Sequence, residues 1–422
     1  KEQLLDSMDL ERERGITILA KNTAVIYKGK RINILDTPGH ADFGGEVERI
    51  MNMVDGVILL VDAVEGVMPQ TRFVLSKALE ANIMPIVVIN KVDRNFSEPK
   101  RVENELLDLF IELEASDKQL EFPTLYASGL KGVADFNADL TNSTNMLPLL
   151  DVVLDCVPAP SQDPLKPLLF QPSLLDYNEY VGRIGIGKII QGKIKVGSQV
   201  VCMRNDGSKV SFRIQKLYGF LGLNRIEIEE AFAGDIVAIS GLTDILVGET
   251  ICDVGYEQRL KPIEINKPTV QMTFGINTSP FAGLEGQWVT NSKIEERLFR
   301  EVQRDVSLEV RNGETKDEWI VSGRGELHLG ILIENMRREG YEFIVSRPKV
   351  ILKEIDGDIC EPFERIQADI FFESVGAVME LLGNRRGILE SMQQNTSQTR
   401  LIYHMPSRGL IGITTDFMTA TK

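Results

Sequence analysis

The segment at residues 32–40, Ile-Asn-Ile-Leu-Asp-Thr-Pro-Gly-His, ends in side chains that can bind a cation and an anion together. The apolar residues Ile32, Ile34 and Leu35 predict a buried strand, and the proline and glycine turn the chain where that strand ends. Asp36 can hold a hydrated cation at this point, and Gly39 has no Cβ, so its N–H can come close to an anion. His40 then lies beside the same anion. The alternative is a strand ending in a turn, with Asp36 as a simple cap.

A second apolar strand, Ile-Val-Val-Ile at residues 86–89, is followed by Asn90-Lys91-Val92-Asp93. Because the carboxyl ends of parallel strands meet at one edge of a sheet, we expect this group to lie near Asp36. The Asp93 carboxylate can accept both N–H donors on one edge of guanine. Asn90 can tie neighbouring loops together, and the Lys91 stem can lie over the flat base. A group of this kind could therefore bind a guanine base, although Asn-Lys-x-Asp alone arises by chance fairly often.

These two groups resemble the third and fourth signature motifs of GTPases, and Asp-Thr-Pro-Gly-His is the form typical of translation factors. Two further segments fit the same family. Residues 14–18, Arg-Gly-Ile-Thr-Ile, resemble the end of switch I, although Thr17 by itself could be an ordinary β-former. Ser128-Gly129-Leu130 resembles the fifth motif, in which glycine here replaces the usual alanine. That motif acts mainly through a backbone N–H, so the replacement need not abolish it.

The resemblance implies a role for each residue. Thr17 and Asp36 would be the metal ligands that hold Mg²⁺, Asp36 through water, and the Gly39 N–H would contact the γ-phosphate. His40 would be the catalytic residue, because it would position the attacking water. The cofactors implied are GTP or GDP with Mg²⁺. The residues implied to bind the nucleotide are Gly39, Asn90, Lys91, Asp93, Ser128, Gly129 and Leu130.

The elements that must position these residues alternate between strand and helix, which predicts an α/β, doubly wound parallel sheet of the P-loop GTPase type. We expect strands at 22–27, 56–62, 85–89 and 123–127, and helices at 43–53, 69–81 and 98–113. No G-x-x-x-x-G-K-[ST] sequence occurs among the 422 residues, so the first strand and the phosphate loop of this fold are missing. A sheet without them would leave apolar strands uncovered. We therefore expect the sequence to be a portion of a longer protein, with an N-terminally incomplete GTPase domain at 1–160.

A proline-rich stretch at residues 157–172 predicts a domain boundary. The short glycine-punctuated strands that follow predict a β-barrel domain at 161–266, in which Gly185 and Gly187 would form turns. A strand-helix-strand-strand-helix order then occurs twice, which predicts two ferredoxin-like split βαβ domains at 267–352 and 353–422. The second of these stops before its last strand, so we expect it to be C-terminally incomplete.

Each ferredoxin-like unit has an arginine-bearing turn before its second helix. Arg324 precedes a helix predicted at 325–339, and Arg408 opens one predicted at 408–419. Both arginines are candidate RNA contacts, since a guanidinium at a helix N-terminus can meet a phosphate. The alternative is that they are ordinary capping or surface residues.

Composition limits the partners. The formal net charge is −15 and no basic run occurs, so any RNA binding must rely on local arginine clusters. The four cysteines are scattered without a C-x-x-C pair, which fits a reducing cytosol and argues against a metal cluster. No apolar run is long enough to span a bilayer. We expect a cytoplasmic monomer with no membrane or DNA partner.

The branch of the family follows from what separates the two ferredoxin-like units. Elongation factor G inserts a large domain there, whereas only residues 349–360 lie between Ser346-Arg347-Pro348 and Glu361-Pro362-Phe363. LepA-like and BipA/TypA-like factors remain. Residues 277–283, Asn-Thr-Ser-Pro-Phe-Ala-Gly, and residues 407–412 resemble the BipA/TypA-like branch.

That resemblance implies ribosome-stimulated hydrolysis of GTP to GDP and phosphate, in stress adaptation or ribosome assembly, with rRNA and ribosomal proteins as partners. A LepA-like elongation factor is one alternative. A second is a binding module in which hydrolysis only sets the residence time. A third is a ribosome-binding scaffold that does not hydrolyse GTP, if the phosphate loop is truly absent.

Overall fold

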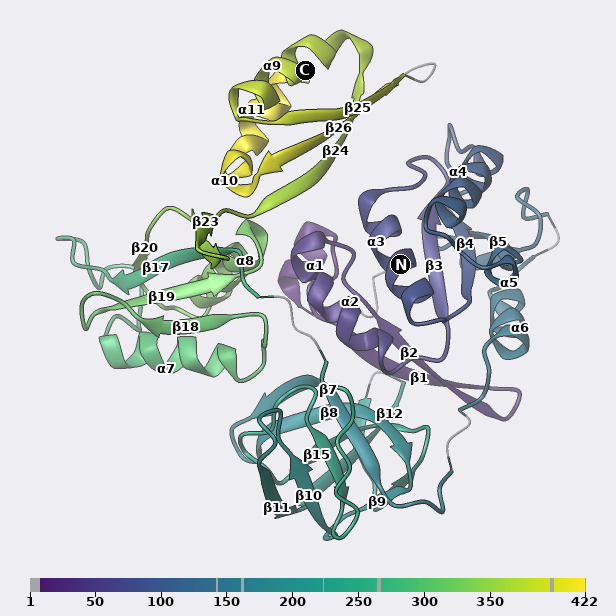
Figure 1. The fold of residues 1–422 in the computed structure, drawn as a ribbon, viewed down its shortest axis with the longest axis vertical. Helices are drawn as coiled ribbons and strands as arrows, with labels where there is room; N and C mark the ends of the chain where they lie inside the picture. Colours follow the sequence, from purple (N-terminus) through teal and green to yellow (C-terminus); the bar gives the residue numbers. More distant parts are fainter. Residues whose placement is uncertain are drawn as a thin grey trace. The chain divides into compact units, whose positions relative to one another are not determined.

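The computed structural model describes residues 8–141, 143–160, 163–222, 224–263, 267–394 and 398–421. The chain divides into two compact units, Lys1–Ile265 and Asn266–Lys422, which are taken in turn below (Figure 1). None of the helices in the described ranges is both long and apolar enough to cross a bilayer.

A four-stranded sheet in the order β3-β4-β5-β6 forms the first part of unit one, with β3, β4 and β5 parallel and β6 antiparallel at the edge. Its strands are β3 (Val57–Asp62), β4 (Pro85–Asn90), β5 (Thr124–Ser128) and β6 (Val133–Asp135). The helices connecting or following them are α3 (Pro69–Glu80), α4 (Pro99–Glu112), α5 (Asp117–Leu120) and α6 (Leu147–Cys156). The predicted β/α alternation is confirmed.

Both faces of this sheet carry apolar side chains, as expected for parallel strands between helices. Val87 and Ile89 of β4 pack in one core with residues of α3 and α4, whereas Ile86 and Val88 point into a second core that includes α6. Two side chains of β3 remain uncovered on this second face: Ile58 is 45% exposed and Leu60 is 60% exposed. The sheet is therefore covered by helices on both sides, but incompletely at β3.

The segment that ends in Asp36 lies outside this sheet. Strands β1 (Lys21–Tyr27) and β2 (Lys30–Asp36) form a separate antiparallel hairpin, and every residue of β2 is half-buried or exposed. The prediction of a buried strand in the same parallel sheet as β4 was wrong for this structure. The physical reason is that no described strand bridges β2 and β3, so β2 has hydrogen-bonded neighbours on one side only. Helix α1 (Asp9–Arg14) precedes the hairpin, and a 3-10 turn, η1 (Ala41–Phe43), and helix α2 (Gly44–Met51) follow it.

An eight-stranded antiparallel sheet makes up the rest of unit one, in the order β11-β10-β16-β7-β8-β15-β12-β13, and β9 pairs separately with β14. Figure 1 shows these strands curled around one core, to which Phe170, Ile189 and Val237 contribute. The bounds are β7 (Leu169–Asn178), β8 (Gly182–Gln191), β9 (Lys193–Lys195), β10 (Gln199–Met203), β11 (Lys209–Arg213), β12 (Lys216–Leu221), β13 (Asn224–Glu227), β14 (Glu230–Phe232), β15 (Ile236–Ser240) and β16 (Thr250–Asp253).

Gly185 and Gly187 do not form turns, as the sequence had suggested, but lie within strand β8. A Cβ at Gly187 would lie 2.1 Å from the carbonyl oxygen of Gln171. The strand needs glycine there because β7, which is irregular around Pro172, approaches the β8 backbone too closely for a side chain.

Helix α2 packs against the curled sheet. Ile50 and Met53, both almost fully buried, share a core with side chains from four of its strands, among them Leu174, Ile184 and Phe220. The segment that begins with His40 is thereby tied to the second part of unit one.

Unit two begins with an antiparallel sheet in the order β18-β19-β17-β20, with β21 pairing to β17. Its elements are β17 (Val270–Ile276), α7 (Asn291–Val302), β18 (Glu309–Asn312), β19 (Glu318–Gly323), α8 (Glu326–Arg338), β20 (Phe343–Val345) and β21 (Lys349–Val350). The helices pack on one face of the sheet around Phe274, Trp319 and Leu329. This arrangement is the predicted split βαβ unit.

A short hairpin, β22 (Lys353–Ile355) and β23 (Asp358–Cys360), follows and was not predicted. A three-stranded sheet in the order β24-β26-β25 comes next. Its elements are β24 (Phe363–Phe371), η2 (Phe372–Ser374), α9 (Val375–Asn384), β25 (Ile388–Gln394), β26 (Gln398–Pro406), α10 (Ser407–Leu410) and α11 (Ile413–Ala420). The single helix predicted at 408–419 was wrong, because Gly412 takes a left-handed φ of 67° and separates α10 from α11. The bounds predicted for the four domains stay predictions.

Candidate functional site

The carboxyl ends of β4 and β5 bring two of the predicted nucleotide-binding segments together. Asn90 ends β4 and pairs with Ala127 of β5, one residue before Ser128. The Asn90 Oδ1 accepts the N–H of Gly129 at 2.9 Å, so this side chain ties the two loops, as its position in the sequence had suggested. Ser128 is fully buried, whereas Leu130 is 78% exposed. The backbone at Gly129 is thus held by the Asn90 side chain and the buried Ser128, while the next residue, Leu130, lies in solvent.

Lys91 and Asp93 extend from the same strand end. Lys91 has a left-handed φ of 63°, and its ammonium forms an ion pair with Asp62 at the end of β3. Burial would raise the pKa of the Asp62 carboxyl, but hydrogen bonds from Lys91 and from the Val64 and Glu65 N–H groups outweigh burial and lower it. Asp62 therefore stays charged and fixes the head of Lys91.

The Asp93 carboxylate lies 3.7 Å from the ammonium of Lys131, which belongs to the loop after Leu130. A partner at that distance is loosely held, so Asp93 can accept hydrogen bonds from a ligand. All six residues predicted to bind guanine thus come from two adjoining loops, at Asn90–Asp93 and Ser128–Leu130.

Thr17, Asp36, Gly39 and His40 lie along the hairpin and the turn that follows it. Asp36 ends β2, and its cross-strand partner is Lys21, the first residue of β1. Thr17 lies four residues before Lys21, in the segment between α1 and β1. Gly39 is exposed, and apart from its two chain neighbours no described residue has an atom within 4 Å of the point where a Cβ would stand. A group that approaches Gly39 meets an open backbone.

The His40 side chain is 41% exposed and lies edge-on to Phe43, with ring centroids 6.2 Å apart. Its Nδ1 accepts the N–H of Asp42 at 3.2 Å. A neutral ring with this partner carries its proton on Nε2, so Nε2 is the atom that can donate to a water. The ring is therefore accessible, and its orientation is set by its own turn.

The donor set at Thr17 and Asp36 suits Mg²⁺. A hydroxyl and a carboxylate are hard oxygen ligands, and Mg²⁺ in nucleotide sites takes one or two such ligands and completes its shell with phosphates and water. Among the residues that the structure describes, no group of three or more His, Cys, Asp or Glu side chains could hold a metal ion. The residues present thus fit a metal that arrives with a nucleotide.

The two candidate RNA contacts belong to unit two. Arg324 is half-buried in the turn before α8, and its backbone N–H donates to Nδ1 of His328 at 3.2 Å. The Nε2 of His328 in turn meets Asp305 at 2.5 Å. This buried histidine and its carboxylate fix the turn that carries Arg324.

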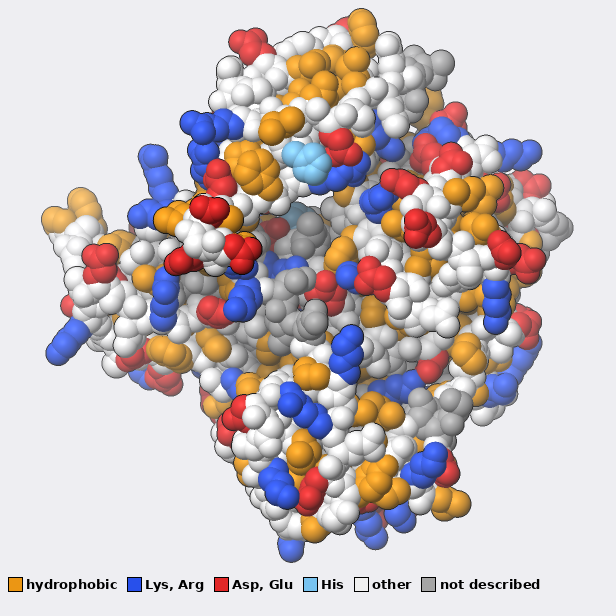
Figure 2. All heavy atoms as spheres, viewed as in Figure 1, with side chains coloured by type: hydrophobic (Ala, Val, Ile, Leu, Met, Phe, Trp, Pro, Cys, Tyr) orange, Lys and Arg blue, Asp and Glu red, His pale blue; other side chains and the backbone are white. Residues whose placement is uncertain are grey.

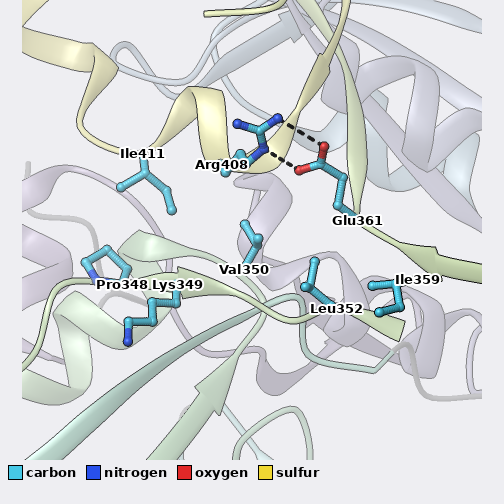
Figure 3. Close-up of a pocket in the computed structure, with 8 residues that line it drawn as sticks. All are labelled: Pro348, Lys349, Val350, Leu352, Ile359, Glu361, Arg408 and Ile411. Atoms are coloured by element: carbon cyan, nitrogen blue, oxygen red, sulfur yellow. Dashed lines mark hydrogen bonds and ion pairs between the residues drawn. The ribbon is translucent and has the colours of Figure 1, made fainter. Parts of the chain in front are cut away.

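Arg408 is not presented to solvent by itself. Its Nε donates to Glu361 at 2.6 Å and its Nη2 to the same carboxylate at 3.3 Å, as Figure 3 shows. The pair lines a cavity of about 660 Å³ between α10 and the β21–β23 segment, together with Val350, Leu352 and Ile359. An RNA phosphate would have to compete with Glu361 for this guanidinium, which favours the structural interpretation of Arg408 that the sequence left open.

Three acidic residues near the site were missed from the sequence. Asp62 holds Lys91, Glu11 accepts N–H groups of the segment that carries Thr17, and Glu46 accepts the N–H of Ala20 at 2.9 Å. Asp62 had a signal, because it ends an apolar strand as Asp36 does. Glu11 and Glu46 sit in charged helical stretches that look solvated in the sequence.

Four family descriptions match the chain. Residues 1–159 match the elongation factor Tu GTP binding domain and residues 182–252 match elongation factor Tu domain 2. Residues 289–347 match elongation factor G domain III and residues 358–422 match the elongation factor G C-terminus.

Three bacterial proteins named large ribosomal subunit assembly factor BipA are similar over nearly the whole chain. The Bacillus subtilis (strain 168) protein is 60% identical over 422 residues, covering 100% of this chain and 69% of the relative. The Synechocystis protein is 53% identical, with 99% and 70% covered, and the Escherichia coli K12 protein is 51% identical, with 100% and 70% covered. The crystal structure of ttk003000868 from Thermus thermophilus has a TM-score of 0.66 at 16% identity, covering 99% of this chain and 89% of that one, and so shares the fold.

Proposed function

The chain belongs to the BipA family of translation-factor GTPases, and from that premise we propose that it binds GTP and hydrolyses it to GDP and phosphate on the ribosome. The observation that supports this most directly is the Asn90–Gly129 hydrogen bond. It joins the two guanine-binding loops into one site at the carboxyl edge of the parallel sheet. The exposed Gly39 and the accessible ring of His40 support the proposed hydrolytic step.

In this proposal the guanine ring lies between the Lys91 stem and the loop at Gly129. The Asp93 carboxylate accepts the two N–H groups on one edge of the base, and a backbone N–H of the Gly129 loop donates to its carbonyl. The Lys91 head stays on Asp62, so the stem is held in place before the base arrives. Recognition therefore rests on residues that the fold has already oriented.

The hydrolytic step uses the turn after β2. The Gly39 N–H donates to the γ-phosphate, and Nε2 of His40 orients a water whose oxygen bonds to the γ-phosphorus as the bond to the bridging oxygen breaks. A proton of that water ends on the phosphate product. Thr17 and Asp36 would hold Mg²⁺, and the charge it would supply there is one that neutralises phosphate oxygens. Catalysis of this kind depends on placement, so the ribosome can stimulate it by fixing His40.

The ribosomal partner is proposed from the relatives, which are named assembly factors of the large subunit. We propose the same role here, which places the protein in the cytoplasm with ribosomes; a part in stress adaptation stays a prediction. The chain carries a net charge of −15, and on the face in Figure 2 basic side chains are interspersed with acidic ones. Contacts to rRNA must therefore be local. Arg324 and Arg408 both stay candidates, and at Arg408 a phosphate would have to compete with Glu361.

We also propose that the 422 residues by themselves bind GTP weakly. None of them supplies the G-x-x-x-x-G-K-[ST] loop, whose backbone N–H groups and lysine make most of the charged contacts to nucleotide phosphates.

The test is GTP hydrolysis by the full-length gene product, with and without purified ribosomes and large subunits. We expect slow hydrolysis alone and strong stimulation by ribosomes. Asp93→Asn should shift preference from GTP toward XTP, because an amide donates where the carboxylate accepted. Each lost charged hydrogen bond corresponds to about 1.5–3 kcal/mol, roughly a 10- to 150-fold loss of GTP affinity.

Asp139→Asn, in an exposed loop of the same part of the chain, serves as the matched control. Unchanged GTP affinity in Asp93→Asn would refute the guanine site. Hydrolysis that ribosomes do not stimulate would refute the proposed partner.

A further inference from the structure

Glu11 is a carboxylate with no access to solvent. It lies in α1, its side chain is 0% exposed, and its Oε2 forms an ion pair with the ammonium of Lys21, which is itself only 16% exposed. A charge buried this deeply needs a full set of partners, because an unpaired one would be strongly destabilising. The partners of Glu11 therefore indicate its role.

The remaining partners of Glu11 are backbone groups around Thr17. Its Oε1 accepts the N–H of Ile18 at 3.1 Å and that of Leu19 at 3.2 Å, while its Oε2 accepts the N–H of Met8 at 3.1 Å. Its carbonyl oxygen accepts the N–H of Gly15 at 2.8 Å. Contacts from Glu11 thus lie on both sides of Thr17, at Gly15 and Ile16 before it and at Ile18 and Leu19 after it.

Burial would raise the pKa of the Glu11 carboxyl, but hydrogen bonds from Lys21 and from the Ile18, Met8 and Leu19 N–H groups outweigh it and lower it. The side chain is therefore a carboxylate at neutral pH, and accepting N–H groups is what a carboxylate does best.

A second anchor connects the same segment to the turn that carries His40. The N–H of Ala20 donates to Oε2 of Glu46 at 2.9 Å, and Glu46 pairs with the buried Arg49 at 3.0 Å, both within α2. Lys21 then opens β1 opposite Asp36. The Thr17 segment is therefore held by α1 on one side and by α2 and the hairpin on the other.

We propose that Glu11 is the positioning residue for Thr17. It holds the segment at residues 15–20 so that the threonine hydroxyl is placed for the metal and the γ-phosphate before GTP binds. The inference rests on the function proposed above and assigns to it a residue that never touches the nucleotide. A helix-capping residue with only a structural role is the alternative.

The two roles differ in what they do to GTP and GDP. Only GTP has the γ-phosphate that Thr17 meets, so loss of the Thr17 segment weakens GTP and leaves GDP nearly unchanged. A purely structural loss lowers both affinities together or only the thermal stability. The decisive quantity is thus the ratio of the two affinities.

The experiment compares Glu11→Ala, Glu11→Gln and Glu249→Ala in the full-length gene product. Glu249 is the matched control, because it lies in the same unit, its side chain is 0% exposed, it pairs with Arg204 at 3.0 Å, and it accepts the Leu246 N–H at 2.8 Å. Nucleotide titrations give the GTP:GDP affinity ratio, and hydrogen exchange of the nucleotide-free protein reports the Ile18 and Leu19 N–H groups directly.

For Glu11→Ala we expect about a tenfold fall in the GTP:GDP affinity ratio and faster exchange at Ile18 and Leu19. Glu11→Gln keeps an oxygen for those two N–H groups, so its ratio should fall by no more than about threefold. Glu249→Ala should lower the melting temperature while leaving both the ratio and this exchange unchanged. A wild-type ratio in Glu11→Ala, or an equal fall for GTP and GDP, would overturn the inference. If the wild-type protein itself fails to bind GTP, the proposed function fails instead.

Discussion

His40→Ala separates a catalytic histidine from a structural one. In the proposed mechanism the ring touches the attacking water and not the nucleotide, so its loss is felt only in the transition state. A histidine packed under the turn would instead lower stability and nucleotide affinity together.

The structure sets the size of each effect. The side chain is 41% exposed, its ring contact with Phe43 is edge-on at 6.2 Å, and its Nδ1 accepts the N–H of the half-buried Asp42 in its own turn. Removing such a group should lower the free energy of unfolding by no more than about 1 kcal/mol. A positioned acid–base or water-orienting side chain contributes at least about a hundredfold in rate, which is roughly 2.7 kcal/mol at the transition state. The catalytic effect should therefore exceed the stability effect by more than a factor of two.

The assay is single-turnover GTP hydrolysis with and without ribosomes, alongside titrations of GTP and GDP and a thermal melt. We expect ribosome-stimulated hydrolysis to fall at least about a hundredfold, with both affinities within about twofold of wild type. His404→Ala is the control, since that side chain is 50% exposed, pairs with Glu390 at 3.0 Å and belongs to the other unit. Wild-type hydrolysis by His40→Ala, or a parallel loss of stability and affinity, would show that the reasoning about this residue is wrong.

Two further predictions concern the nucleotide affinity of a chain without a G-x-x-x-x-G-K-[ST] sequence and the carboxylate of Glu342. The 422-residue chain alone should give no measurable GTP or GDP binding by calorimetry at micromolar concentrations, and micromolar binding would contradict the argument from the phosphate loop. The pKa of Glu342 is lowered to about 2, chiefly by the Gly283 N–H and then by the Gly286 N–H and the Asn277 amide. A depressed carboxyl pKa contributes stability above its unfolded value and loses it as the pH falls toward about 2. In Glu342→Gln the free energy of unfolding should therefore fall less steeply as the pH is lowered, which denaturant titrations at several pH values measure. The same fall with pH as in the wild-type protein would show that this carboxylate does not hold the loop at residues 277–286.

The sequence by itself determined most of the strands and helices that carry the predicted nucleotide-binding residues. Asn90 and Ser128 end apolar strands whose length and composition mark them locally, and the structure places both at the same sheet edge. The two split βαβ units were likewise readable from the order of strands and helices, because that order depends on periodicity along the chain.

Tertiary packing decided what no local pattern could. Lys91 forms an ion pair with Asp62 because β3 and β4 are neighbours in the sheet. Arg408 forms an ion pair with Glu361, which lies 47 residues away in the sequence. Gly187 is a glycine because the backbone of Gln171 passes beside it, not because the chain turns there. Glu11 looks in the sequence like one of several solvated charges, and its burial beneath the Thr17 segment depends on how α1, the hairpin and α2 fold together. The physical reason is the same in each case: ion pairs, close backbone approaches and buried charges are set by which distant residues become neighbours, and a single sequence does not state that.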